Sequence, residues 1–140
     1  MIWCFDAAGD KNAKFHTLGQ ALAVAGAEQG VAVDIQPDQH ISIVTDADIP
    51  ATCTANHALG TITYPATSDG PQKTGLLIYV RASTTAEDPW AVRGYADTSK
   101  TFPGDSTINQ LFDYRHFDAY HLLGRTAAKA AWDNAVRINP

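Results

Sequence analysis

The chain has 140 residues, with 15 acidic side chains against 10 basic ones and a formal net charge of −5. The Lys and Arg residues are scattered and form no concentrated basic surface, which argues against nucleic acid as a partner and against electrostatic docking on anionic membranes. Hydrophobic residues make up 45% of the chain, enough for the core of one domain spanning residues 1–140. No apolar run approaches the ~18 residues of a membrane span. The first six residues lack the basic region of a signal peptide, so a cytoplasmic protein is expected.

The N-terminal part predicts a strand followed by a helix. Ile2–Phe5 is apolar throughout and leads into a polar loop, Asp6–Asp10. Thr17 and Gln20 have the spacing of a capping box, so a helix is expected to begin at Thr17, and Gly30 is suited to end it. The helix should bury a stripe of apolar residues: Leu18, Ala21, Leu22 and Ala25.

The middle of the chain predicts short strands. Residues 31–35 alternate between apolar and polar side chains, as in a half-buried strand, and Pro37 closes it. A further short strand is expected over residues 41–44, and residues 45–58 look irregular. Residues 61–64 and 75–82 flank a segment rich in turn-forming residues, which indicates an antiparallel hairpin. The second strand of this hairpin is apolar on both faces and should lie at the centre of the sheet.

Helical patterns dominate the C-terminal part. Asp88 is expected to cap a short helix over residues 90–95, with Pro89 in its first turn. Asp105 or Ser106 should cap a further helical stretch, and residues 114–135 predict the longest helix. One face of this long helix carries Phe117, Tyr120, Gly124, Ala127 and Ala131, and its small residues should allow this face to pack closely on a sheet.

Together these elements predict an α/β fold in which a mixed β-sheet is flanked by helices. The apolar first strand requires neighbours that this chain does not fully provide. We therefore expect the chain to associate, either with itself or with a partner.

Few residues have the spacing of a known catalytic or metal site. Cys4 and Cys53 form no CxxC pair and are expected to be reduced. No G-x-S-x-G motif is present. Gly104–Ser106 and Asp118–His121 are similar to two sequence blocks of SGNH-type esterases, but they lie too close together for that fold. Two Asp/His pairs at helical i, i+3 spacing could hold a metal, although ordinary solvated positions are favoured for them: Asp113 with His116, and Asp118 with His121.

Three stretches resemble the C-terminal segment of bacterial patatin-like phospholipase-related proteins. The first combines a strand and an Asp-x-x-Gly-Asp loop over residues 3–10 with Phe15–Gly19. The second is the strand Gly75–Ala82, and the third is Phe102–Thr107 with the aromatic helix up to Gly124. The resemblance implies the C-terminal portion of a patatin-like α/β/α domain. It covers nearly the whole chain but begins after the catalytic serine and aspartate of that family, so no catalytic residue carries over.

The resemblance therefore implies a non-catalytic accessory or binding module that completes a patatin-like partner chain or pairs with itself. Its ligand would be a lipid or acyl group, without a cofactor or a metal. The candidate ligand-binding residues are Asp6, Asp10, Arg81 and His116. The alternative is an independent small hydrolase whose polar site has no recognised motif.

Overall fold

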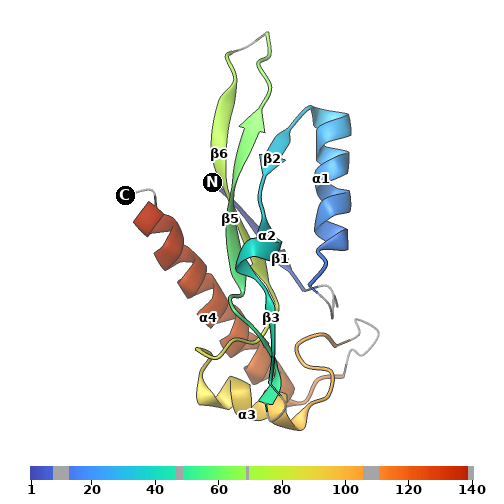
Figure 1. Ribbon diagram of the computed structural model, residues 1–140, viewed down its shortest axis with the longest axis vertical. Coiled ribbons are helices and arrows are strands. Elements are labelled where there is room, and N and C mark those ends of the chain that lie inside the picture. The colour runs from blue at the N-terminus through green and yellow to red at the C-terminus, as the bar shows by residue number, and fades with distance from the viewer. Residues whose placement is uncertain (8–12, 47–48, 69, 106–110, 139–140) are drawn as a thin grey trace.

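A computed structural model describes residues 1–7, 13–46, 49–68, 70–105 and 111–138 (Figure 1). It has the mixed α/β architecture that the sequence predicts. The main sheet has the strand order β1-β6-β5-β2, in which β1 is parallel to β6 and the other neighbours are antiparallel. Its strands are β1 (Ile2–Asp6), β2 (Ala32–Asp34), β5 (His57–Tyr64) and β6 (Lys73–Arg81).

The centre of this sheet is β6, as the two-faced apolar pattern predicts. Residues 77–81 are all buried, and their side chains alternate between two cores. Ile78 and Val80 pack against the C-terminal helix, whereas Tyr79 packs against the first helix. The predicted antiparallel hairpin is also confirmed, and its tip projects beyond the helices (Figure 1).

Helix α4 (Tyr114–Ile138) is the longest helix and continues through Gly124 without a break. Asp113 caps it, because its Oδ1 accepts the backbone N–H of His116 at 2.8 Å. The predicted buried face is partly wrong: Phe117 is 69% exposed and Gly124 is exposed as well. The helix is rotated by about one residue relative to that prediction, and it buries the following residues: His116, Ala119, Leu123, Ala127, Ala131 and Ala135.

Helix α1 (His16–Gln29) covers the opposite face of the sheet from α4. The predicted capping box is wrong, because the helix begins at His16 and no side chain caps it. The residue before the helix, Phe15, has a left-handed φ of 54°. Gly30 ends the helix as predicted, with φ 63°. Of the predicted stripe, Leu18 is buried and Ala21 is exposed, while the other two members, Leu22 and Ala25, are half-buried.

The prediction that residues 45–58 are irregular is wrong: within the described residues, part of this stretch belongs to a second sheet. It pairs β3 (Ile43–Asp46) with β4 (Ile49–Cys53) in antiparallel fashion, after the short helix α2 (Pro37–His40). The Thr54 hydroxyl ties the ends of this hairpin together, since it donates to the His40 carbonyl at 2.8 Å and accepts the Ser42 N–H at 2.9 Å. Thr54 and His40 lie 14 positions apart in the sequence, so no local sequence pattern predicts their hydrogen bond.

Helix α3 (Trp90–Thr98) is longer than predicted and packs on the first half of α4 through Val92. Asp88 does not cap it, because its Oδ2 accepts the N–H of Thr85 at 2.7 Å. Within the described part of the chain, no helix is both long and apolar enough to cross a membrane.

Candidate functional site

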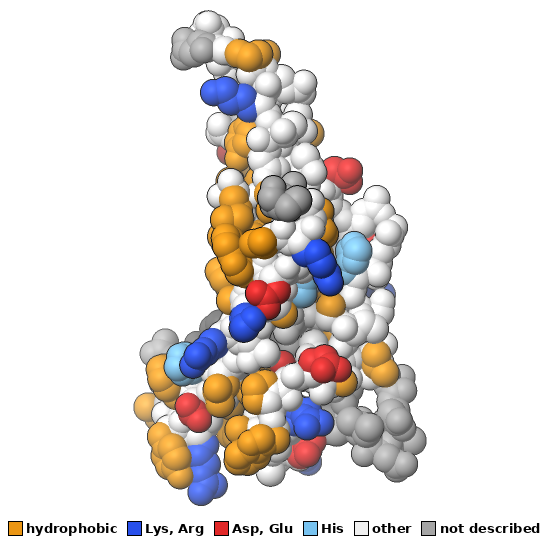
Figure 2. Space-filling view, turned by 90° about the vertical axis from the view of Figure 1, so that its left-hand side faces the viewer, with side chains coloured by type: hydrophobic (Ala, Val, Ile, Leu, Met, Phe, Trp, Pro, Cys, Tyr) orange, Lys and Arg blue, Asp and Glu red, His pale blue; other side chains and the backbone are white. Residues whose placement is uncertain are grey.

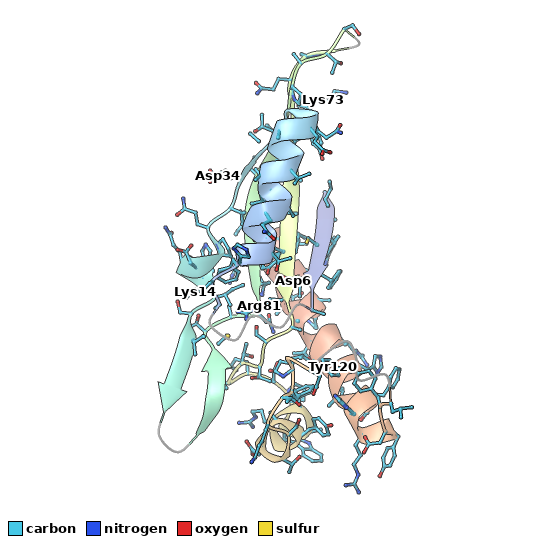
Figure 3. All side chains as sticks on the ribbon, turned by 90° about the vertical axis from the view of Figure 1, so that its right-hand side faces the viewer. Asp6, Lys14, Asp34, Lys73, Arg81 and Tyr120 are labelled. Carbon is cyan, nitrogen blue, oxygen red and sulfur yellow. The ribbon has the colours of Figure 1, made fainter. Side chains whose placement is uncertain are left out.

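The two parallel strands place Asp6 and Arg81 side by side at their carboxyl ends (Figure 3). This edge is where α/β folds commonly bind ligands, because several strand ends and loops converge there. The Asp6 carboxylate accepts a hydrogen bond from the Tyr79 hydroxyl at 2.7 Å. Burial, together with this hydrogen bond, raises the pKa of Tyr79, so the phenol remains a neutral donor to Asp6 at physiological pH.

Arg81 is only 7% exposed and lies close to the start of α1. Its guanidinium carbon lies 5.5 Å from the centroid of the Phe15 ring, a distance typical of cation–π contact. The left-handed backbone at Phe15 sets the position of this ring at the entry to the helix. Two of the predicted ligand residues, Asp6 and Arg81, are thus brought together by contacts with different elements.

A hollow of about 180 Å³ lies between these strand ends and α4. It is lined mainly by apolar atoms, from Phe5, Asp6, Ala7, Val80, Arg81, Ala82, Tyr120, Leu123, Gly124 and Ala127. We call it the carboxyl-end pocket. A Cβ atom added at Gly124 would meet no atom within 4 Å, so this glycine leaves space open at the helix wall instead of allowing the close packing on the sheet that the sequence suggested.

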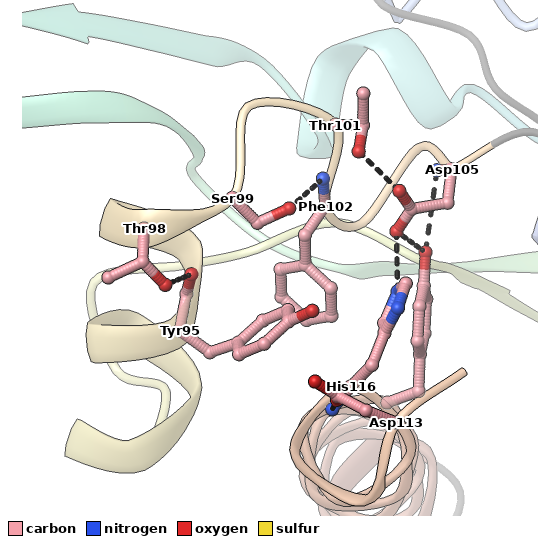
Figure 4. A network of polar contacts seen from close by, with 9 residues as sticks. Tyr95, Thr98, Ser99, Thr101, Phe102, Asp105, Asp113 and His116 are labelled. Carbon is pink, nitrogen blue, oxygen red and sulfur yellow. Dashed lines mark hydrogen bonds and ion pairs between the residues drawn. The ribbon is translucent and has the colours of Figure 1, made fainter. Parts of the chain in front are cut away.

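His116 belongs to a polar network that includes Tyr120, a residue of the pocket wall; Figure 4 shows His116 and Asp105 in this network. The Asp105 carboxylate is the centre of this network. Its Oδ2 accepts bonds from the Tyr120 hydroxyl at 2.9 Å and from Nε2 of His116 at 2.8 Å. Its Oδ1 accepts the hydroxyl of Thr101. Asp105 therefore ties the segment after α3 to the first turns of α4. The helical stretch that Asp105 or Ser106 is predicted to cap begins at residues outside the described part of the chain.

Hydrogen bonds to the Asp105 carboxylate stabilise its charged form. Although burial raises the pKa of its carboxyl, the hydrogen bonds from Thr101, Tyr120 and His116 outweigh burial and leave the pKa below its ordinary value. The His116 ring is further enclosed by the rings of Tyr95, Phe112 and Tyr120. His116 thus supports the position of Tyr120, which is the residue that reaches the pocket.

Other predicted residues are not gathered at this site. Asp10 and Ser106 lie outside the described residues. Asp118 and His121 are both exposed on α4. Asp113, the partner proposed for His116, binds that residue's backbone instead of sharing a metal position. Within the described ranges, no three His, Cys, Asp or Glu residues gather in a way that could hold a metal ion.

A second, wider groove of about 600 Å³ was not predicted from the sequence. It lies between β5 and the C-terminal half of α4, where Nε2 of His57 is 3.2 Å from Nδ2 of Asn134. Burial lowers the pKa of His57, and the nearby His40 lowers it further, so the ring is neutral at pH 7. These two residues lie 77 positions apart, and no local pattern joins them.

The structure brings three of the four predicted ligand residues to one end of the molecule, two at the carboxyl-end pocket and His116 behind Tyr120. The pocket itself depends on α4, whose packing no sequence motif specified. Comparison with known proteins adds no relative: no protein-family model, no curated protein and no solved structure matches this chain.

Proposed function

We propose that the chain is a binding module that holds a short acyl chain, or a similar apolar group, in the carboxyl-end pocket. The observation that carries the proposal is the apolar lining of this pocket at the carboxyl ends of two parallel strands. The position is a common ligand site in α/β folds, and an apolar wall selects hydrocarbon over polar solutes. An acyl ligand also agrees with the resemblance to patatin-like proteins.

Binding is favoured over catalysis by the residues around the pocket. Covalent hydrolysis requires a nucleophile within hydrogen-bond reach of a base. Among the residues that the structure describes, none that lines the pocket is a Ser, Cys or His. The nearest acids already have donors, since Asp6 accepts from Tyr79 and Asp105 accepts from Tyr120. The alternative of an independent hydrolase therefore has less support.

An accessory role completes the proposal. A patatin-like partner chain would supply the serine and aspartate, and this module would contribute an acyl-binding wall. The cytoplasm is the compartment in which we place the module.

The size of the pocket limits the ligand. About 180 Å³ corresponds to roughly six water volumes of ~30 Å³ each, or a chain of about six carbons. Burying six methylene groups contributes about 5 kcal/mol at ~0.8 kcal/mol each. The entropy of association opposes this gain, so the dissociation constant should be no lower than about 1 mM.

The test is calorimetric titration of the purified chain with hexanoate and with hexanol, which have six carbons each but differ in charge. Gly124→Leu should weaken binding of both, because Gly124 lines the pocket and a Cβ atom there would meet no other atom within 4 Å, so the added side chain has room to occupy the pocket. Thr61→Leu is the matched control, since Thr61 lines the wider groove and not the pocket. Loss of binding in Thr61→Leu with full binding in Gly124→Leu would move the ligand to the groove, and no binding of either compound up to ~20 mM would refute the proposal.

A further inference from the structure

The two edge strands of the main sheet differ in how they are protected. β2 has only three residues, carries the exposed Asp34 and is soon followed by Pro37, which are features that prevent edge-to-edge pairing. β1 has five residues, and its segment Ile2–Phe5 contains no charge and no proline. Phe5 is 61% exposed and Ile2 45%. Among the described residues, no strand pairs with the outer side of β1, and an apolar edge of this kind is a template for pairing with another chain.

The backbone of β1 has one set of groups turned away from the sheet. The Asp6 carbonyl accepts the N–H of Ala82, on the β6 side, at 2.9 Å. Because backbone groups alternate in direction along a strand, Ile2, Cys4 and Asp6 face β6. The N–H and C=O groups of Trp3 and Phe5 therefore point outward, at equal distances on either side of Cys4.

The side chains of Trp3 and Phe5 begin an aromatic surface that continues onto α4. The Trp3 ring stacks on Phe5 at 5.7 Å and on Trp132 at 6.3 Å between centroids. Val136 and Ile138 are exposed farther along the helix. Figure 2, which views the side of the molecule on which α4 lies in Figure 1, shows hydrophobic side chains gathered on this side. We call Trp3, Phe5 and Trp132 the aromatic surface.

We infer that a second copy of this chain pairs with the open edge, with the two β1 strands antiparallel about a two-fold axis at Cys4. In this register Trp3 of each copy lies opposite Phe5 of the other and exchanges both backbone hydrogen bonds with it. Cys4 lies opposite its own counterpart in a non-hydrogen-bonded pair, with about 4.5 Å between Cα atoms. The sheet becomes continuous over eight strands, since each copy contributes four.

The symmetry of β1 favours a second copy over an unrelated chain. A two-fold axis at Cys4 places aromatic residues opposite aromatic residues, an arrangement that stabilises strand pairs, and no like charges meet between Ile2 and Phe5. Because the axis is perpendicular to the sheet, both α4 helices lie on the same face. The two aromatic surfaces then adjoin across the axis. The contact rests on the strand edge and these side chains, so its area should be near the lower limit for stable pairs, about 1,200 Å² in total.

The experiment combines sedimentation equilibrium with disulfide trapping. A contact of this size should give a monomer–dimer equilibrium with a dissociation constant on the order of 1–100 µM. In a Cys53→Ser background, oxidation with copper phenanthroline should convert the dimer to a Cys4–Cys4 disulfide, because the expected Cα separation is close to disulfide geometry. The linked residues are identified by mass spectrometry.

Two variants and a control test the surface. Phe5→Lys places a charge on the edge, and Trp132→Lys places one on α4; each should weaken dimerisation at least tenfold. Trp90→Lys is the matched control, because Trp90 is 82% exposed on α3 and should leave the dimer unchanged. Far-ultraviolet circular dichroism confirms that each variant is folded.

The inference is overturned if the chain remains monomeric at every concentration up to ~1 mM, which would leave the edge to a different partner. A dimer that resists both lysine variants, or that forms no Cys4–Cys4 disulfide, would also overturn the pairing. Hexanoate binding is measured in Trp132→Lys as well, because Trp132 does not line the carboxyl-end pocket. Failure of the dimer with intact binding is therefore distinguishable from failure of the proposed function.

Discussion

Replacing Asp105 with Asn should destabilise the fold by about 3 kcal/mol at pH 7. The side chain of Asp105 is 9% exposed and its carboxylate accepts from His116, Tyr120 and Thr101. A hydrogen bond to a charged group contributes about 1.5–3 kcal/mol, but three bonds to one carboxylate are coupled and do not add. Asn retains one acceptor oxygen and presents an NH₂ group in place of the other, so part of the network survives.

The loss should depend on pH in a defined direction. The pKa of Asp105 is below its ordinary value of 3.8 in the folded chain, so the charged form stabilises the fold above that pH. This contribution is lost as pH falls through the lowered folded pKa. The stability difference between wild type and Asp105→Asn should therefore be constant from pH 5 to 7 and shrink below about pH 4.

Urea titration of the two proteins at several pH values measures both effects. Thermal melts should show a decrease of about 9 °C at pH 7, at roughly 3 °C per kcal/mol for a chain of this size. Asp118→Asn is the control, because Asp118 is exposed on the same helix and should change stability by less than about 0.5 kcal/mol. A change in Asp105→Asn as small as in the control would show that the network does not stabilise the fold, and the reasoning would be wrong.

Two further predictions concern single contacts. Tyr79→Phe should cost about 2 kcal/mol, because it removes the 2.7 Å donor to Asp6, whereas Tyr114→Phe, at an exposed tyrosine, should be nearly neutral in the same urea titration. Gly30→Ala should cost about 1 kcal/mol, because φ is 63° there. Gly19→Ala should instead stabilise by about 0.5–1 kcal/mol, because it lies inside α1 with no atom within 4 Å of an added Cβ. Equal signs for the two glycine variants in thermal melts would contradict the assigned backbone conformations.

Local patterns determined the elements whose signals are contained within a few residues. The two-faced apolar run over residues 76–80 identified β6 as the central strand, because side chains on both faces of a strand are buried where the sheet is covered on both faces. The sustained helical period after Asp113 identified α4, and Gly30 marked the end of α1 through its tolerance of positive φ. These features depend on the backbone preferences of single residues and on the spacing of apolar residues, and both can be read from a short stretch of sequence.

Only the tertiary structure decided which surfaces meet. The buried face of α4 is the one with His116 and not Phe117, because Asp105 supplies a carboxylate to His116 from a segment outside the helix. The second sheet, the wider groove and the contact between Asp6 and Tyr79 likewise join residues far apart in the chain. The carboxyl-end pocket exists because the parallel pairing of β1 with β6 places two strand ends beneath α4. Such pairings depend on the packing energy of the whole molecule, which a local sequence pattern does not reveal.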